Sequence, residues 1–127
     1  MREKEGEKMQ YLVDMKLAAY GRPTGGPQDG ISFIEQFILP SLELCKKLED
    51  EKKILAGGPA NGAIRLVMIV SAESAQELDE LIESLPIWPQ METTVTPLTS
   101  FNGRMVAVRP RLERLKAKLQ NGPTAAV

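Results

Sequence analysis

The chain contains 127 residues, with 16 basic and 17 acidic side chains, a single cysteine and no histidine. This length supports one domain with a core of its own, and 43% apolar with 26% charged residues is typical of a globular protein. The absence of histidine excludes Ser-His-Asp and Cys-His catalysis, so any proton transfer must use a carboxylate, lysine, tyrosine, cysteine or water.

Residues 10–17 alternate between two faces, as expected of a β-strand. One face carries the apolar side chains of Tyr11, Val13, Met15 and Leu17. The other face carries Leu12, Asp14 and Lys16. Residues 18–30 hold four glycines and two prolines, which predicts a loop.

Apolar residues then recur every three or four positions over residues 31–53, which predicts a helix that begins near Asp29 or Ser32. Pro40 lies inside this helix and must kink or split it, because the proline ring blocks the preceding turn. Residues 54–56 form a short strand candidate before a glycine-rich turn. Residues 63–72 are almost continuously apolar, as in a central strand that is covered on both faces.

A second helix is expected after Ser74, which would cap it, with Glu77 completing a capping box. This helix ends before Pro86. Residues 91–99 form the last strand, in which Pro97 suits a sheet edge, and residues 111–119 form a short amphipathic helix. The order of elements predicts an α+β protein with the ferredoxin-like βαββαβ arrangement and a C-terminal helical tail.

We divide the chain into a disordered leader over residues 1–8, an α+β domain over residues 9–103, and a basic C-terminal helix and tail over residues 104–127. In a ferredoxin-like fold both helices cover one face of the sheet. The other face, which includes Leu12 and Leu98, would meet water unless a partner covers it. Two sheets packed face to face would bury it, so we expect a homodimer or a larger homo-oligomer.

Residues 74–98 contain a Glu-Leu pair at 77–78, a Leu-Pro-Ile-Trp-Pro turn at 85–89, Met91, and the sequence Val-Thr-Pro-Leu at 95–98. This run resembles the muconolactone isomerase family. The resemblance implies a dimeric α+β barrel and a cofactor-independent double-bond shift on a small lactone from the breakdown of aromatic compounds. The family's first strand shows a basic and then an acidic residue, often after a histidine, whereas this chain has Leu12, Asp14 and Lys16 there.

Three charged side chains are candidates for catalysis. Asp14 and Lys16 lie on the strand face that would point into such a barrel, and Arg65 on the central strand can point there too. Asp14 would remove and return a proton if desolvation raised its pKa, while Lys16 and Arg65 would stabilise the enolate. The alternative is a structural ion pair between neighbouring strands, which perturbs a pKa equally well.

Five further side chains are candidates for substrate binding, namely Tyr20, Arg22, Trp88, Glu92 and Thr94. The loop that carries Tyr20 and Arg22 could close over a ligand, Trp88 could form the wall of a pocket, and the two strand residues could line a cavity. Each position also has a structural interpretation: a surface loop, an anchor for the two-proline turn, and a solvated sheet edge. Cys45 lies on the apolar stripe of the first helix, where we expect a buried thiol without an activating group.

Residues 104–118 carry six basic side chains and one acidic side chain, a local excess of five positive charges. No interleaved aromatic residues accompany them, so we expect a solvated helix face or a tail that docks on an acidic partner subunit, and no nucleic-acid partner. We expect no membrane partner either, because the longest apolar run, residues 66–70, is far shorter than the roughly 20 residues of a membrane helix. No secretory leader is apparent, which favours a cytoplasmic location.

Two functional hypotheses follow from these features. The first is an enzyme of the muconolactone isomerase type that moves a proton on a small lactone or oxo-acid without a metal or cofactor. The alternative is a non-catalytic α+β barrel that binds a small molecule or has only a structural role. A ligand cavity of roughly 300–1,000 Å³ on the open sheet face would separate a binding protein from a structural one.

Overall fold

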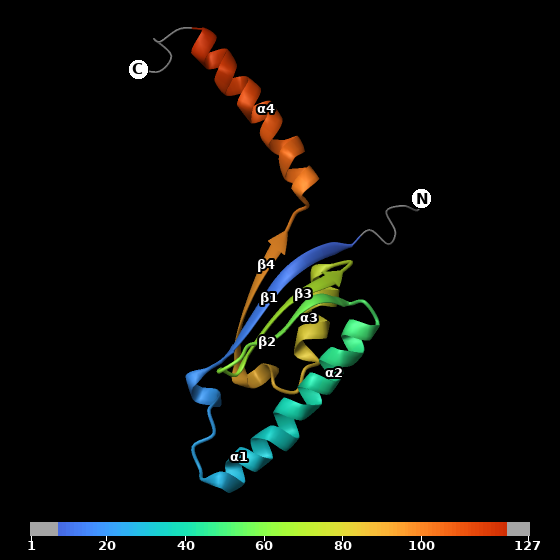
Figure 1. The fold of residues 1–127 in the computed structure, drawn as a ribbon, viewed down its shortest axis with the longest axis vertical. Helices are drawn as coiled ribbons and strands as arrows, with labels where there is room; N and C mark the ends of the chain where they lie inside the picture. The colour runs from blue at the N-terminus through green and yellow to red at the C-terminus, as the bar shows by residue number, and fades with distance from the viewer. Residues whose placement is uncertain (1–7, 122–127) are drawn as a thin grey trace.

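The computed structural model describes residues 8–121 and shows a four-stranded antiparallel sheet with helices on one face (Figure 1). The strands are β1 (Met9–Leu17), β2 (Ile54–Pro59), β3 (Arg65–Ala72) and β4 (Met91–Leu98). They lie in the order β2-β3-β1-β4, which is the ferredoxin-like arrangement, so the predicted fold class is confirmed for the single chain. The predicted leader lies outside the described residues except for Lys8.

The first helical segment is a continuous rod of three parts: α1 (Pro27–Phe33), the π turn η2 (Ile34–Ile38) and α2 (Leu39–Asp50). It begins before the predicted start near Asp29. Gly26 is the cap residue and Pro27 fits the first turn, where backbone N–H groups have no intrahelical partner. The loop before this helix is therefore shorter than predicted, and it contains the 3-10 turn η1 (Ala19–Gly21).

Pro40 does not break this rod. The π turn lies directly before it, and the N–H of Leu39 donates to the carbonyl of Ile34, five residues earlier. This wider turn fits a proline that cannot donate a helical hydrogen bond of its own. The irregularity expected at Pro40 therefore takes the form of a π turn.

The second helix, α3 (Ala75–Glu83), begins where the sequence predicts, because Ser74 caps it. The Ser74 hydroxyl accepts a hydrogen bond from the N–H of Glu77 at 3.1 Å. The Glu77 carboxylate in turn accepts one from the N–H of Glu73 at 2.6 Å, one residue before the usual partner in a capping box. Both bonds satisfy N–H groups at the helix start.

The core lies between the sheet and these helices. Its largest fully buried side chains come from the central strands and the turn after α3, and they are Met15, Met68, Leu85, Val13 and Val70. The buried hydroxyl of Ser41 accepts a hydrogen bond from the N–H of Ile87 at 3.0 Å. This bond attaches α2 to the turn η3 (Trp88–Gln90) that leads into β4.

The strand β2 is longer than the predicted strand at residues 54–56, because Gly57 and Gly58 lie in the strand and not in a turn. Gly57 has a φ of +114°, and a Cβ at this position would collide with the carbonyl oxygen of Val67 on β3. Glycine therefore allows the two strands to stay paired here. The turn follows at residues 60–64, and β3 begins two residues later than predicted.

The C-terminal helix α4 (Phe101–Gln120) is much longer than the predicted helix at residues 111–119. Ser100 caps it by accepting a hydrogen bond from the N–H of Gly103 at 2.9 Å, and Pro110 lies within it. The helix points away from the sheet (Figure 1), and the division proposed between residues 103 and 104 falls inside it. None of the helices at residues 8–121 is both long and apolar enough to cross a membrane.

Candidate functional site

The sheet face opposite the helices is open, and the side chains of β1 alternate between the two faces as predicted. Val13 and Met15 point toward the helices and are fully buried. On the open side, Leu12 and Asp14 are half-buried and Lys16 is exposed. The polar residues of β1 therefore lie on the face that is free to meet a ligand or a second molecule.

The strand pairing arranges the open face in rows across β3, β1 and β4. From the C-terminal end of β1 these rows are Arg65-Lys16-Glu92, Val67-Asp14-Thr94, Ile69-Leu12-Thr96 and Ser71-Gln10-Leu98. Charged side chains gather in the first two rows, whereas the last two rows are uncharged and hold the large aliphatic side chains of Ile69, Leu12 and Leu98 beside three polar ones. The face is thus polar at one end and more apolar at the other.

The three predicted catalytic side chains lie together in the polar rows. Arg65 donates two hydrogen bonds to Asp14, from Nε to Oδ1 at 3.0 Å and from Nη2 to Oδ2 at 2.7 Å. The hydrogen bond from Arg65 lowers the pKa of Asp14 and outweighs the opposing effect of burial, and the charges of Arg65 and Lys16 act in the same lowering direction. The pKa of Arg65 is raised by the same pairing.

This pairing corrects one expectation. The general-base hypothesis required a raised pKa for Asp14, whereas in the single chain the pKa is lowered. The reason is that the Asp14 side chain is still 28% exposed, so desolvation is weaker than the bidentate contact with Arg65. The geometry of the isolated chain is that of an ion pair between neighbouring strands.

Two of the predicted substrate-binding residues lie on the same face. Glu92 lies opposite Lys16, and Thr94 lies opposite Asp14. Both side chains are exposed, because β4 is the edge strand of the sheet. They border the polar rows on one side, and in the isolated chain they form a solvated edge.

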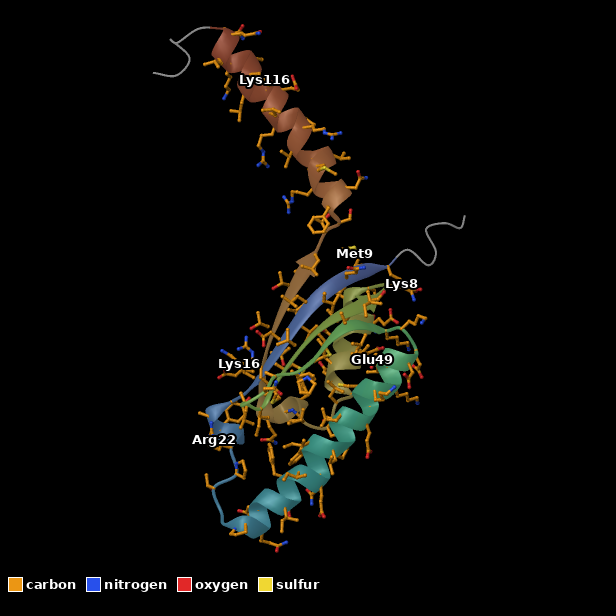
Figure 2. The ribbon with its side chains drawn as sticks, in the orientation of Figure 1. Lys8, Met9, Lys16, Arg22, Glu49 and Lys116 are labelled. Carbon is orange, nitrogen blue, oxygen red and sulfur yellow. The ribbon has the colours of Figure 1, made fainter. Side chains whose placement is uncertain are left out.

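An open hollow of about 640 Å³ lies at the polar end of the sheet. Its charged lining residues are Lys16, Arg22 and Arg65, all three of them cationic, and Figure 2 shows Lys16 and Arg22 near the same end of the sheet. Leu17 and the turn at residues 62–64 complete the lining. The sequence predicted a glycine-rich turn in this region but gave no sign that the turn lines a hollow. The hollow suits an anionic group such as a carboxylate.

Tyr20 and Trp88 do not line this hollow. Tyr20 is 73% exposed in η1, and Trp88 is half-exposed at the start of η3. The two turns are joined by a hydrogen bond from the N–H of Ala18 to the carbonyl of Gln90 at 2.9 Å. The structure therefore places both turns near the polar end of the sheet, with Tyr20 and Trp88 outside the lining of the hollow.

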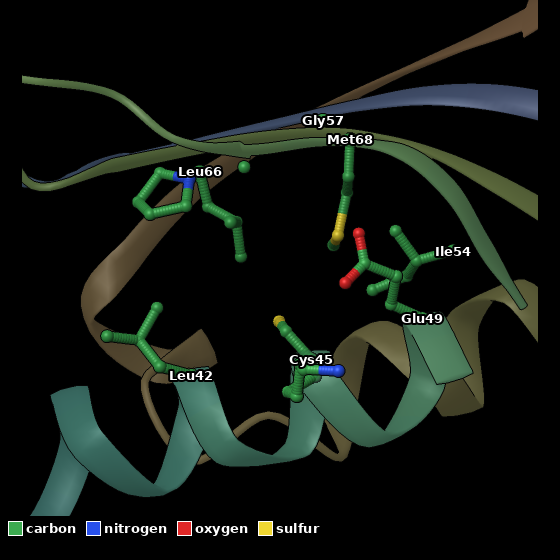
Figure 3. Close-up of a pocket in the computed structure, with 10 residues that line it drawn as sticks. Leu42, Cys45, Glu49, Ile54, Gly57, Leu66 and Met68 are labelled. Carbon is green, nitrogen blue, oxygen red and sulfur yellow. The ribbon is translucent and has the colours of Figure 1, made fainter. Parts of the chain in front are cut away.

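A second cavity of about 180 Å³ lies between α2 and the β2–β3 pair (Figure 3). Cys45 points into it from α2, toward Met68 on the sheet. Burial raises the pKa of the Cys45 thiol to about 11, so the thiol stays protonated at neutral pH. Among the described residues, neither this cavity nor any other place brings together three acidic or cysteine side chains that could hold a metal ion.

The strand order, the two covering helices and the open charged face define a small α+β domain of the ferredoxin-like class. The profile of the muconolactone delta-isomerase family matches residues 9–103, and the chain belongs to this family. The match covers every strand and stops near the start of α4.

Comparison with one solved structure agrees on the fold. The crystal structure of muconolactone isomerase at 3.3 Å resolution matches with a TM-score of 0.59 and 18% sequence identity, over 72% of this chain and 90% of that one. The structure of an uncharacterized protein from Thermotoga maritima matches with a TM-score of 0.44 and 15% identity, over 73% of this chain and 100% of that one. A comparison with curated proteins finds no match.

Proposed function

We propose that this protein transfers a proton within a small lactone or oxo-acid and so shifts a carbon–carbon double bond, as an isomerase of the muconolactone isomerase type. Membership of the family supports this class of chemistry. The observation that carries the proposal is the position of Asp14 beside two cations, Arg65 and Lys16, on a sheet face that the helices leave open.

The proposed reaction needs a base for a carbon-bound proton and positive charge for the enolate that forms. Asp14 is ionised at neutral pH, since its pKa lies below the ordinary value of 3.8, and is therefore in the form that accepts a proton. Asp14 removes a proton from the carbon next to the double bond, and the electron pair of that C–H bond moves through the conjugated C=C–C=O system onto the carbonyl oxygen to form a dienolate. The electrons then return from the oxygen, the carbonyl re-forms, and the carbon at the other end of the former double bond takes the proton back from Asp14, which leaves the double bond shifted by one position. Arg65 and Lys16 would stabilise the negative charge on that oxygen.

A second copy packed on the open face would complete the site. The more apolar rows, with Leu12 and Ile69, offer a contact surface, and the cationic hollow would remain as the ligand cavity. Asp14 does not line this hollow itself and borders it through its contact with Arg65. Its volume of about 640 Å³ lies within the range of small-molecule sites. Exclusion of water by the second copy would also raise the pKa of Asp14 and make it a stronger base. A homodimer is therefore part of the proposal.

The test is turnover of unsaturated lactones, muconolactone first, by the wild-type protein and by Asp14→Asn. We expect the variant to lose a factor of about 10²–10⁴ in kcat, because acid–base groups contribute effects of this size. Glu43→Gln on the exposed side of α2 removes a carboxylate charge on the opposite face of the sheet and is expected to keep wild-type turnover. Turnover of Asp14→Asn within about threefold of wild type would contradict the role of Asp14 as the base.

One observation favours the non-catalytic alternative. The bidentate contact between Arg65 and Asp14 occupies both carboxylate oxygens, as in a structural ion pair. In that case lactones or carboxylic acids would bind without being converted. Titration calorimetry combined with proton NMR separates the two functions, since only an isomerase converts the bound ligand into the isomer with the shifted double bond.

A further inference from the structure

The helix α4 carries an apolar stripe along its whole length, although none of its residues is buried. Six apolar side chains recur at intervals of four, three, four, three and four residues: Phe101, Met105, Val108, Leu112, Leu115 and Leu119. Each is at least 40% exposed, and Phe101 reaches 92%. Alternating intervals of three and four residues are typical of a helix that packs lengthwise against another element.

Basic side chains border this α4 stripe on both sides, namely Arg104, Arg109, Arg111, Lys116 and Lys118. Two α4 helices paired along their stripes would bring like charges together at both borders, which disfavours pairing of α4 with itself. Pro110 lies on the opposite side of the helix, so its missing N–H does not interrupt the stripe. A suitable partner for α4 is therefore a surface with an apolar strip for the stripe and acidic side chains for its basic borders.

The remainder of the described chain has the opposite charge. Residues 99–121 carry six basic and one acidic side chain, a net charge of +5, whereas residues 8–98 carry eight basic and thirteen acidic side chains, a net charge of −5. No lysine or arginine occurs between Arg65 and Arg104. Within that interval α3 exposes three acidic side chains, Asp79, Glu80 and Glu83. The acidic surface is thus part of the same protein.

An apolar strip lies on the helical face of β4. Val95 and Pro97 are paired with Val13 and Tyr11, which are buried under the helices, yet Val95 is 38% exposed and Pro97 is also exposed. The reason is that α2 lies against β2 and α3 lies against β3, so the helical layer ends before it reaches the edge strand.

We propose that α4 of one copy docks on the helical layer of a second copy, with its stripe on the exposed strip of β4 and its basic borders against the acidic side chains of α3. The structure directs α4 outward from the point where Ser100 caps it, and Lys116 lies far from the sheet of its own chain (Figures 1 and 2). This contact uses the side of the sheet opposite to the proposed dimer contact. It is therefore independent of the proposed function, and the two contacts together would join dimers into a larger assembly.

The direct test is cross-linking between distinguishable copies of the full-length chain. Unlabelled and ¹⁵N-labelled protein are mixed in high salt, returned to low salt, and treated with a zero-length carboxyl–amine cross-linker. Mass spectrometry is expected to find Lys116 or Lys118 joined to Asp79, Glu80 or Glu83, in pairs that combine one labelled with one unlabelled chain. Cross-links within one chain only, or between two α4 helices only, would overturn the proposal.

A pair of matched variants tests the stripe itself. Leu112→Ser combined with Leu115→Ser removes two central stripe residues, whereas Ala107→Ser combined with Ala117→Ser changes the opposite side at a similar cost in helix propensity. By sedimentation velocity we expect the stripe variant to weaken association about tenfold or more, because central apolar contacts dominate such interfaces. The control is expected to match wild type. A stripe variant that associates as strongly as the control would overturn the proposal. So would a stripe variant that keeps the assembly mass of the wild type but no longer binds anionic phospholipid vesicles that the wild type binds.

Discussion

The two faces of the sheet differ in how their side chains are used. The face under α2 and α3 is filled by side chains such as Met68 and Val70, which are almost wholly removed from water. The open face alternates half-buried aliphatic residues with the Asp14–Arg65 pair and with exposed Lys16. One face therefore determines whether the chain folds, and the other is available for a ligand or a second copy. Substitutions on adjacent residues of one strand can separate these roles.

The largest expected effect comes from the covered face. Met68→Ala should reduce the free energy of unfolding by about 2–5 kcal/mol, because it leaves a cavity in a packed core. Ile69→Ala, the next residue on β3, points to the open face and should cost about 1 kcal/mol or less in the isolated chain. Urea denaturation measures both. Equal losses would mean that the open face is already closed by packing.

A smaller difference is expected between two neighbouring glycines of β2. Gly57 lies opposite Met68 with a positive φ, so Gly57→Ala should cost about 1–3 kcal/mol through strain and through collision with the Val67 carbonyl. Gly58 lies opposite Val67, and a Cβ there would meet no atom within 4 Å. Gly58→Ala is therefore the control, with little or no change expected in the same denaturation experiment.

On the open face the expected loss is in association and not in folding. Ile69→Glu places a charge among the more apolar rows, and we expect at least a tenfold weaker dimer, which corresponds to about 1.4 kcal/mol. Gln10→Glu adds the same charge at the exposed margin of that face and should have a much smaller effect. Sedimentation velocity measures both. A dimer unchanged by Ile69→Glu would contradict the use of this face as an interface.

The smallest expected effect concerns pH. The pKa of Asp14 is lower in the folded chain than its ordinary value of 3.8, so the pair with Arg65 stabilises the fold above that value. This contribution is lost as the pH falls through the lowered pKa, below about pH 4. Carbon-detected NMR titration should show the low pKa of Asp14 in the monomeric chain, and Arg65→Gln should return it toward 3.8.

Much of the fold was predictable because the determinants are local. The period-two alternation of residues 11–16 assigned each side chain to its face, and the Ser74 cap marked the start of α3. The start of α1 was predicted too late, because the Gly26-Pro27 step was read as loop although proline favours the first helical turn. The length of α4 was underestimated as well: the predicted helix begins at residue 111, whereas the helix begins at Phe101 and continues through Pro110.

The site was predictable in its residues but not in its contacts. Asp14, Lys16 and Arg65 were identified as candidates, yet the contact between Asp14 and Arg65 joins positions 51 residues apart and depends on the strand register. In that register Arg65 lies opposite Lys16 and reaches diagonally to Asp14. Tyr20 and Trp88 were also identified as candidates, but neither lines the hollow. The sequence of a turn does not show in which direction its aromatic side chain will point.

The most direct measurement is a crystal structure of the assembled protein, examined for what covers Asp14 and Arg65. We predict that the sheet of a second copy covers the open face and that an enclosed polar cavity remains, with the Asp14 carboxylate directed into it. An open face that is closed throughout by apolar packing, with the Asp14–Arg65 pair left in solvent outside it, would contradict both the site and the proposed isomerase.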